Sequence, residues 1–247
     1  LLAGPLRALA QGPDHALCFD TCDLVDRGLV GGMDATLHGS ATCVPETGLV
    51  CDGSDDGYAD LNDAQLGGAM SFEAWARWDA LHSWSRIFDF GDGPGDHNIW
   101  LGNYVDSSTI RAQANKEDGG WVGVEEVGDI ALESWTHLVL TIDEAALKLF
   151  QDGELVGTAD AGGSTPPLMT RANHYLCKSN WDTPYLEGAI ASLRAAGLDA
   201  GWARLAASVC VRLGAFEWTR GCSLGACALR LRVVAGDARR LGARHAQ

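Results

Sequence analysis

The acidic residues of this chain do not form the pattern that glycoside hydrolysis requires. The retaining reaction needs two carboxylates about 5 Å apart. Two such acids on one strand must alternate with other residues, because every second side chain shares a face. Glu73 is followed at the alternate positions by Trp75 and Arg77, and Glu125 and Glu126 are adjacent. The sequence therefore predicts no hydrolase site.

The sequence also gives little support for other catalytic arrangements. His97, His137 and His174 have no serine or cysteine near them in a nucleophile motif. Polysaccharide lyases use arginine, histidine and tyrosine from separate strands, so Arg86, His137 and Tyr175 stay a candidate trio. Any β-sandwich of this size would supply such a trio.

Calcium prefers hard oxygen ligands on flexible loops, and two stretches carry them. The first candidate set is Asp89, Asp92, Asp96 and Asn98. The second is Asp52 and Asp56, with Asp55 between them. Neither spacing fits an EF-hand, and these residue types also hydrogen-bond their own backbone in tight turns. Calcium binding and turn formation both remain open from the sequence.

Tryptophan is unusually frequent, with nine residues against six phenylalanines and four tyrosines. An exposed aromatic face can stack on the C–H face of a sugar ring. We expect most tryptophans, Trp100 among them, to pack in the core. The candidate ligand-binding residues are Trp181, Asp182, Tyr185 and Arg86.

The elements that position these residues are predicted to be strands. In residues 71–78 every second residue is apolar, which is typical of a half-buried strand. A loop rich in glycine and aspartate follows residues 87–90, and residues 99–101 resume the sheet. Further alternation predicts strands at 49–52, 58–61, 109–115, 121–127, 134–143, 174–177 and 186–194.

Two shorter elements are predicted from local signals. Residues 147–158 form a hairpin that turns at Asp152 and Gly153, where a two-residue turn needs positive φ. A short C-terminal helix is expected over residues 200–208, capped by Asp199. The rest of the chain is all-β.

Several motifs together resemble the laminin-G-like (LamG) branch of the concanavalin A-like lectin/glucanase superfamily. The similar stretches are EAW at 73–75, SRIFDFG at 85–91, NIWLG at 98–102, WTH at 135–137 and DG at 152–153. They follow the family's order over residues 24–207. The resemblance implies a jelly-roll β-sandwich of two antiparallel sheets, and it strengthens the case for calcium at one rim.

Charge and length narrow the function classes. The formal net charge of −15 disfavours nucleic acid and anionic membrane as partners, since both need basic patches. No apolar run approaches the length of a transmembrane segment. The 247 residues suit one sandwich at 24–207, with a leader or linker at 1–23 and an arginine-rich tail at 208–247.

Eight cysteines favour an oxidising, extracellular compartment. The resemblance places the domain's ends together, which implies a bond from Cys18 or Cys22 to Cys210. Cys43 and Cys51 are expected to pair across a hairpin, and Cys222 with Cys227. Cys177 is expected to be buried and free, or paired with the remaining N-terminal cysteine.

The expected function is that of a secreted, non-catalytic module that binds a glycan or an extracellular protein with the assistance of calcium. This expectation comes from the resemblance, because a fold alone does not fix a function. A glycan-active enzyme with an unrecognised site and a structural module of a larger surface protein remain the alternatives.

Overall fold

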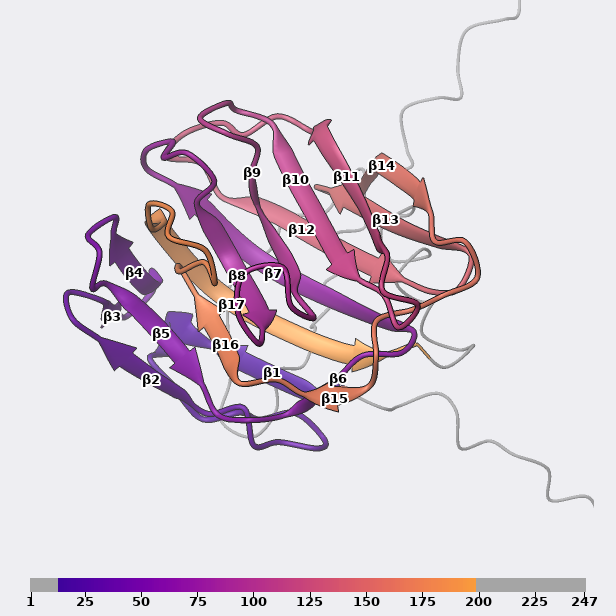
Figure 1. Ribbon diagram of the computed structural model, residues 1–247. Helices are drawn as coiled ribbons and strands as arrows, with labels where there is room; N and C mark the ends of the chain where they lie inside the picture. Colours follow the sequence, from indigo (N-terminus) through magenta and orange to yellow (C-terminus); the bar gives the residue numbers. More distant parts are fainter. Residues whose placement is uncertain (1–12, 199–247) are drawn as a thin grey trace, which may run out of the picture.

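The computed structural model describes residues 13–198, which form a β-sandwich of two antiparallel sheets (Figure 1). The one helical segment in this range is the 3-10 helix η1 (Phe19–Thr21). In residues 13–198 no helix is long and apolar enough to cross a membrane. The expected helix at 200–208 and the tail at 208–247 lie outside the described residues.

The larger sheet has eight strands in the order β14-β13-β12-β7-β17-β4-β3, with β1 beside β17. Its strands are β1 (His15–Cys18), β3 (Thr42–Val44), β4 (Gly48–Asp52), β7 (Met70–Trp78), β12 (Thr136–Ile142), β13 (Ala146–Gln151), β14 (Glu154–Asp160) and β17 (Glu187–Gly197). The last strand, β17, therefore lies in the middle of the sheet.

The second sheet has seven strands in the order β11-β10-β9-β8-β16-β5-β2. Its strands are β2 (Ala35–His38), β5 (Tyr58–Leu61), β8 (Arg86–Gly91), β9 (Ile99–Asn103), β10 (Ile110–Asn115), β11 (Trp121–Val127) and β16 (Asn173–Leu176). A separate two-stranded ribbon pairs β6 (Gln65–Leu66) with β15 (Met169–Thr170). The expected jelly-roll sandwich agrees with this architecture.

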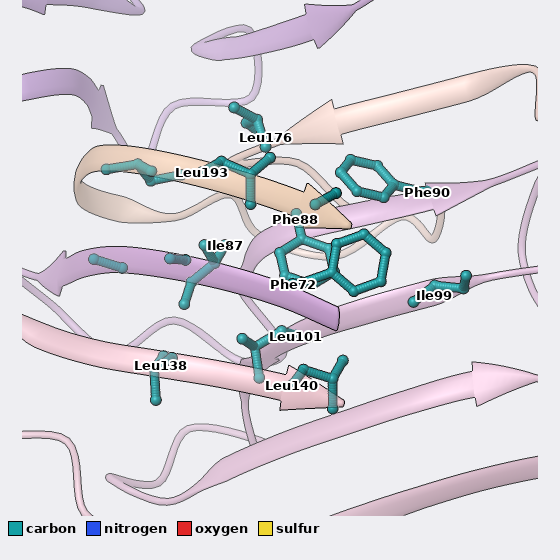
Figure 2. Close-up of a cluster of buried hydrophobic side chains, with 14 of the residues drawn as sticks. Phe72, Ile87, Phe88, Phe90, Ile99, Leu101, Leu138, Leu140, Leu176 and Leu193 are labelled. Carbon is teal, nitrogen blue, oxygen red and sulfur yellow. The ribbon is translucent and has the colours of Figure 1, made fainter. Parts of the chain in front are cut away.

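The core fills the space between the two sheets (Figure 2). Alternate residues of β7 are buried along its whole length, as the periodicity predicts. Phe72 of β7 packs against Phe88 and Phe90 of β8, with ring centroids 5.1 and 5.8 Å apart. Because these contacts join one sheet to the other, they fix which face of each strand looks outward.

The β13–β14 hairpin confirms the turn expected at its tip. Asp152 and Gly153 have φ of 50° and 89°, the left-handed pair that a two-residue turn requires.

The assignment of residues 1–23 to a leader or linker is corrected at residues 15–18, because these residues form the strand β1. His15 to Cys18 pair with Ala195 to Ser192 of β17, a partner too distant in sequence for local patterns to reveal.

Two disulfides lie within the described residues, and neither matches the expected pairing. Cys22 bonds Cys43, and Cys51 bonds Cys177. The expected Cys43–Cys51 pair is wrong because Cys51 reaches across the core from β4 to the residue after β16, so its bond ties the two sheets. Cys177 is accordingly not free. The expected bonds to Cys210 and Cys222 fall outside the described residues.

Candidate functional site

The outer face of the seven-stranded sheet gathers aromatic and charged side chains. Phe88 of β8, Ile99 of β9 and Ala112 of β10 point into the core. On each of these strands the residues that alternate with them therefore point outward. Strand register then sets one row across the sheet: Tyr175 opposite Asp89, and Asp89 opposite Trp100. The row continues to Gln113 of β10. Residues from four neighbouring strands thus share this face.

Two arginines on this face lie among aromatic rings. We call this set the arginine cluster; its members are Arg86, Arg111, Trp84, Trp100, Tyr104, Trp121 and Trp181. The guanidinium carbon of Arg86 lies 3.6 Å from the centre of the Trp100 ring and 5.8 Å from that of Trp181. That of Arg111 lies 5.5 Å from Trp100 and 5.9 Å from Trp121. These are cation–π distances.

The two arginines differ in whether a carboxylate forms an ion pair with them. Arg111 forms an ion pair with Glu125 at 3.0 Å and donates to the side chain of Gln113. Arg86 is buried and donates to the Trp84 carbonyl oxygen, but its Nε atom has no hydrogen-bond partner. Within residues 13–198 no carboxylate lies at ion-pair distance from it. Burial lowers the pKa of Arg86 to about 10, although Asp89 attracts the charge.

Local structure at the end of β8 explains how this cluster is assembled. The register between β8 and β9 shifts between Arg86 and Phe88, which re-aims the Arg86 side chain. Asn103, buried at the end of β9, accepts a hydrogen bond from Ser85 and donates to the carbonyl oxygens of His82 and Val105. These bonds hold the two loops that carry Trp84 and Tyr104.

Asp89 anchors the loop that brings Trp181 to the cluster. Its carboxylate accepts hydrogen bonds from the side chains of Asn98 and Ser179 and from the backbone and side chain of Asn180. Burial raises the pKa of Asp89 against these donors. Gly91 permits the arrangement, because a Cβ atom there would collide with the Asn98 amide. Asp89 thus serves as a structural acceptor.

A second group of rings occupies the other half of the same face. This tyrosine cluster consists of Tyr58 of β5, Tyr175 of β16, Tyr185 and Lys178. The Lys178 ammonium lies 4.0, 4.4 and 5.8 Å from the ring centres of Tyr58, Tyr175 and Tyr185. His38 stacks on the far side of Tyr58, with ring centroids 4.5 Å apart. Three rings therefore surround one cation.

The four residues chosen from the sequence divide between these clusters. Arg86 and Trp181 meet in the arginine cluster, whereas Tyr185, from the same loop as Trp181, enters the tyrosine cluster. Asp182 is exposed. The sequence missed Arg111, Tyr58 and Lys178; Arg111 and Tyr58 are outward residues of alternating strands, and pairing register was needed to bring them to these groups.

The lyase trio does not converge. Arg86 and Tyr175 lie on the seven-stranded sheet, but His137 lies on β12 of the other sheet. There His137 and Arg194 bond Glu73 at 2.9 and 3.0 Å. Burial opposes ionisation of Glu73, yet these two partners lower its pKa to about 2.

The candidate calcium residues are engaged in hydrogen bonds. His97 contacts both Asp92 and Asp96 at 3.0 Å. The Ser54 hydroxyl lies 2.7 Å from Asp52 and 3.0 Å from Asp56. Among residues 13–198, no three acidic, histidine or cysteine side chains gather to hold a metal ion. The backbone N–H of Ser54 also donates to Asp52, as in a turn stabilised by an aspartate side chain.

Comparison with protein families decides the identity of the fold. A laminin G family model described as the concanavalin A-like lectin/glucanases superfamily matches residues 52–197. The chain belongs to this superfamily. The resemblance stated from the sequence is thereby confirmed. The superfamily match begins in β4, so β1 to β3 precede it. No curated protein sequence matches the chain significantly.

Solved structures of the same fold come from carbohydrate-active and toxin proteins. Domain 4 of AbnA, a GH43 extracellular arabinanase from Geobacillus stearothermophilus solved with arabinotriose, superimposes with a TM-score of 0.59 at 20% identity and covers 79% of this chain and 98% of its own. The botulinum neurotoxin serotype G binding domain gives 0.59 at 10% identity, covering 81% and 50%. Trypanosoma rangeli sialidase gives 0.55 at 19% identity, covering 82% and 34%. These likenesses establish the fold.

Proposed function

We propose that this domain is a non-catalytic carbohydrate-binding module whose ligand lies on the arginine cluster. The observation that carries the proposal is the combination of cations and rings on one outward sheet face. Trp121, with 58% of its surface exposed, offers a ring for stacking, and Arg111 beside it supplies hydrogen-bond donors. Sugars present both an apolar C–H face and hydroxyl oxygens, so they match both features.

The acids on this face support binding over hydrolysis. Asp89 uses its carboxylate to hold Asn98 and Asn180, and Glu125 pairs with Arg111. A hydrolase would need one of them as an ionised nucleophile and the other as a proton donor at close distance. The arabinotriose bound to domain 4 of the arabinanase makes a neutral oligosaccharide a reasonable first probe.

The proposed site of action is extracellular. Two disulfides within residues 13–198 are of the kind that persists in oxidising compartments. A protein partner carrying glycans would satisfy the same chemistry. If calcium assists binding, we propose that it binds at the exposed turn of Asp52 and Asp56. The carboxylate of Asp89 already accepts hydrogen bonds from amide groups, whose N–H groups would repel a cation.

A binding measurement tests the proposal. The purified domain is titrated calorimetrically with neutral and acidic oligosaccharides and screened on a glycan array. Trp121→Ala should weaken binding about tenfold, the loss expected for one stacked ring. Leu155→Ala, which removes an equally exposed apolar side chain from β14 of the other sheet, is the matched control. Absence of binding across the array, or release of reducing ends by the wild type, would refute the proposal.

A further inference from the structure

The tyrosine cluster has no role in binding a single sugar at the arginine cluster, yet it shares the same outward face. Trp121, the ring proposed for stacking, lies on β11 and Tyr175 on β16, so four strand spacings separate them in the order β11-β10-β9-β8-β16. This corresponds to about 19 Å across the sheet. One sugar ring does not span that distance, whereas a short oligosaccharide does.

Hydrogen bonds hold the two clusters in a fixed relation. The Tyr175 hydroxyl donates to Asn173, Asn173 donates to Asn180, and Asn180 donates to Asp89. The loop that carries Asn180 sends Trp181 to one cluster and Tyr185 to the other. The spacing between the clusters is therefore built into the fold.

Lys178 is the polar group of the tyrosine cluster that a ligand could use. Within residues 13–198 its ammonium has no hydrogen bond and no ion pair, and burial lowers its pKa. An ammonium carries three donors, which here face only aromatic rings. Because Lys178 itself fills the space among the tyrosines, a foreign cation is excluded, and hydroxyl oxygens are the matching partners.

Each cation on this face is attracted by a carboxylate, although within the described part of the chain only Arg111 forms an ion pair. Arg111 pairs with Glu125, Asp89 attracts Arg86, and Asp60 attracts Lys178. The chain as a whole carries a formal charge of −15. An acidic ligand would meet Glu125 beside Arg111 and a repulsive overall field, whereas neutral hydroxyls gain donors without that cost.

We infer that the tyrosine cluster is a second subsite and that the ligand is a linear, neutral oligosaccharide lying across the strands from β11 to β5. This inference rests on the proposed function, since it extends the same site. It specifies both the length and the charge of the ligand. A terminal monosaccharide or an acidic glycan does not meet the specification.

The test is a calorimetric titration with neutral arabino-, xylo-, cello- and galacto-oligosaccharides from monosaccharide to hexasaccharide, beside oligogalacturonates and sulfated oligosaccharides. In at least one neutral series, affinity should rise about tenfold once the chain reaches both clusters. Lys178→Met and Tyr185→Ala should remove that gain and leave disaccharide binding unchanged. Lys148→Met, on β13 of the other sheet, is the control.

The outcomes separate the two proposals. Affinity that is independent of chain length, or unchanged in both variants while Trp121→Ala weakens it, overturns the second subsite and leaves the first in place. Tighter binding of the acidic oligosaccharides overturns the neutral ligand class. No binding of any oligosaccharide overturns the proposed function and this inference with it. Thermal melting of each variant verifies that it folds.

Discussion

Arg86 lies with its guanidinium carbon 3.6 Å from the centre of the Trp100 indole ring. Trp100 is 2% exposed although it points outward, because this guanidinium group and Trp181 cover it. The ring thus serves as a platform that holds the cation in place. Free stacking surface is left instead at Trp121 on β11, which is separated from β9 by β10.

Arg86→Lys should destabilise the domain by about 1–2 kcal/mol, because a lysine ammonium cannot reproduce the planar stacking of guanidinium on indole. The free energy of unfolding in urea, followed by tryptophan fluorescence, measures the loss. Arg27→Lys is the control, since Arg27 has an exposed side chain. Equal stability of the two variants would show that the Arg86–Trp100 contact contributes little.

The disulfide between the sheets should stabilise more than the one near the N-terminus. The bond between Cys51 and Cys177 closes a loop with a sequence separation of 126, against 21 for that between Cys22 and Cys43. The chain-entropy relation gives about 5 and about 3 kcal/mol. Urea unfolding of the two double alanine variants tests the order, and a larger loss from the Cys22–Cys43 pair would contradict it.

Stability should fall as the pH drops from about 6.5 to about 4, through His174. Burial, together with the charge of Arg171, lowers the pKa of this histidine to about 4. In this pH window His174 binds a proton in the unfolded chain but not in the folded chain. The free energy of unfolding therefore decreases as the pH falls. The full effect is about 3 kcal/mol.

His174→Phe should flatten this part of the pH profile, since both ring nitrogens of His174 are buried without partners and the ring packs on Phe90. His38→Phe, a half-buried histidine on β2, is the control. Unfolding free energies measured across the pH range decide the matter. A profile in the His174 variant as steep as in the wild type would assign the dependence to other groups.

Calcium should raise the melting temperature if it binds at the turn of Asp52 and Asp56, because a ligand that binds only the folded state stabilises it. Asp52→Asn should abolish the rise, and Asp118→Asn, in another exposed turn, should not. Scanning calorimetry with calcium and with chelator provides the comparison. Identical transitions would mean that Asp52, whose pKa the Ser40 and Ser54 hydroxyls lower to about 2, serves its own turn alone.

The sequence predicted the elements whose signals are local. Alternation located β7, and the Asp152–Gly153 turn located the β13–β14 hairpin. It could not locate β1, whose partner β17 lies far along the chain. The candidate site was found only in part for the same reason: Arg86 and Trp181 stand out by type, but Arg111 gains meaning only from the register that places it beside them.

The position of β17 has a consequence for how the domain forms in the cell. One edge of this strand pairs with β7, and its other edge is divided between β4 at residues 187–190 and β1 at residues 192–195. While a ribosome still holds β17, three strands made earlier lack their central partner. Non-local pairing of this kind is slow and leaves strand edges open to aggregation. We therefore expect the edges of β1, β4 and β7 to stay unpaired until synthesis has passed residue 197, after which β17 pairs with all three strands.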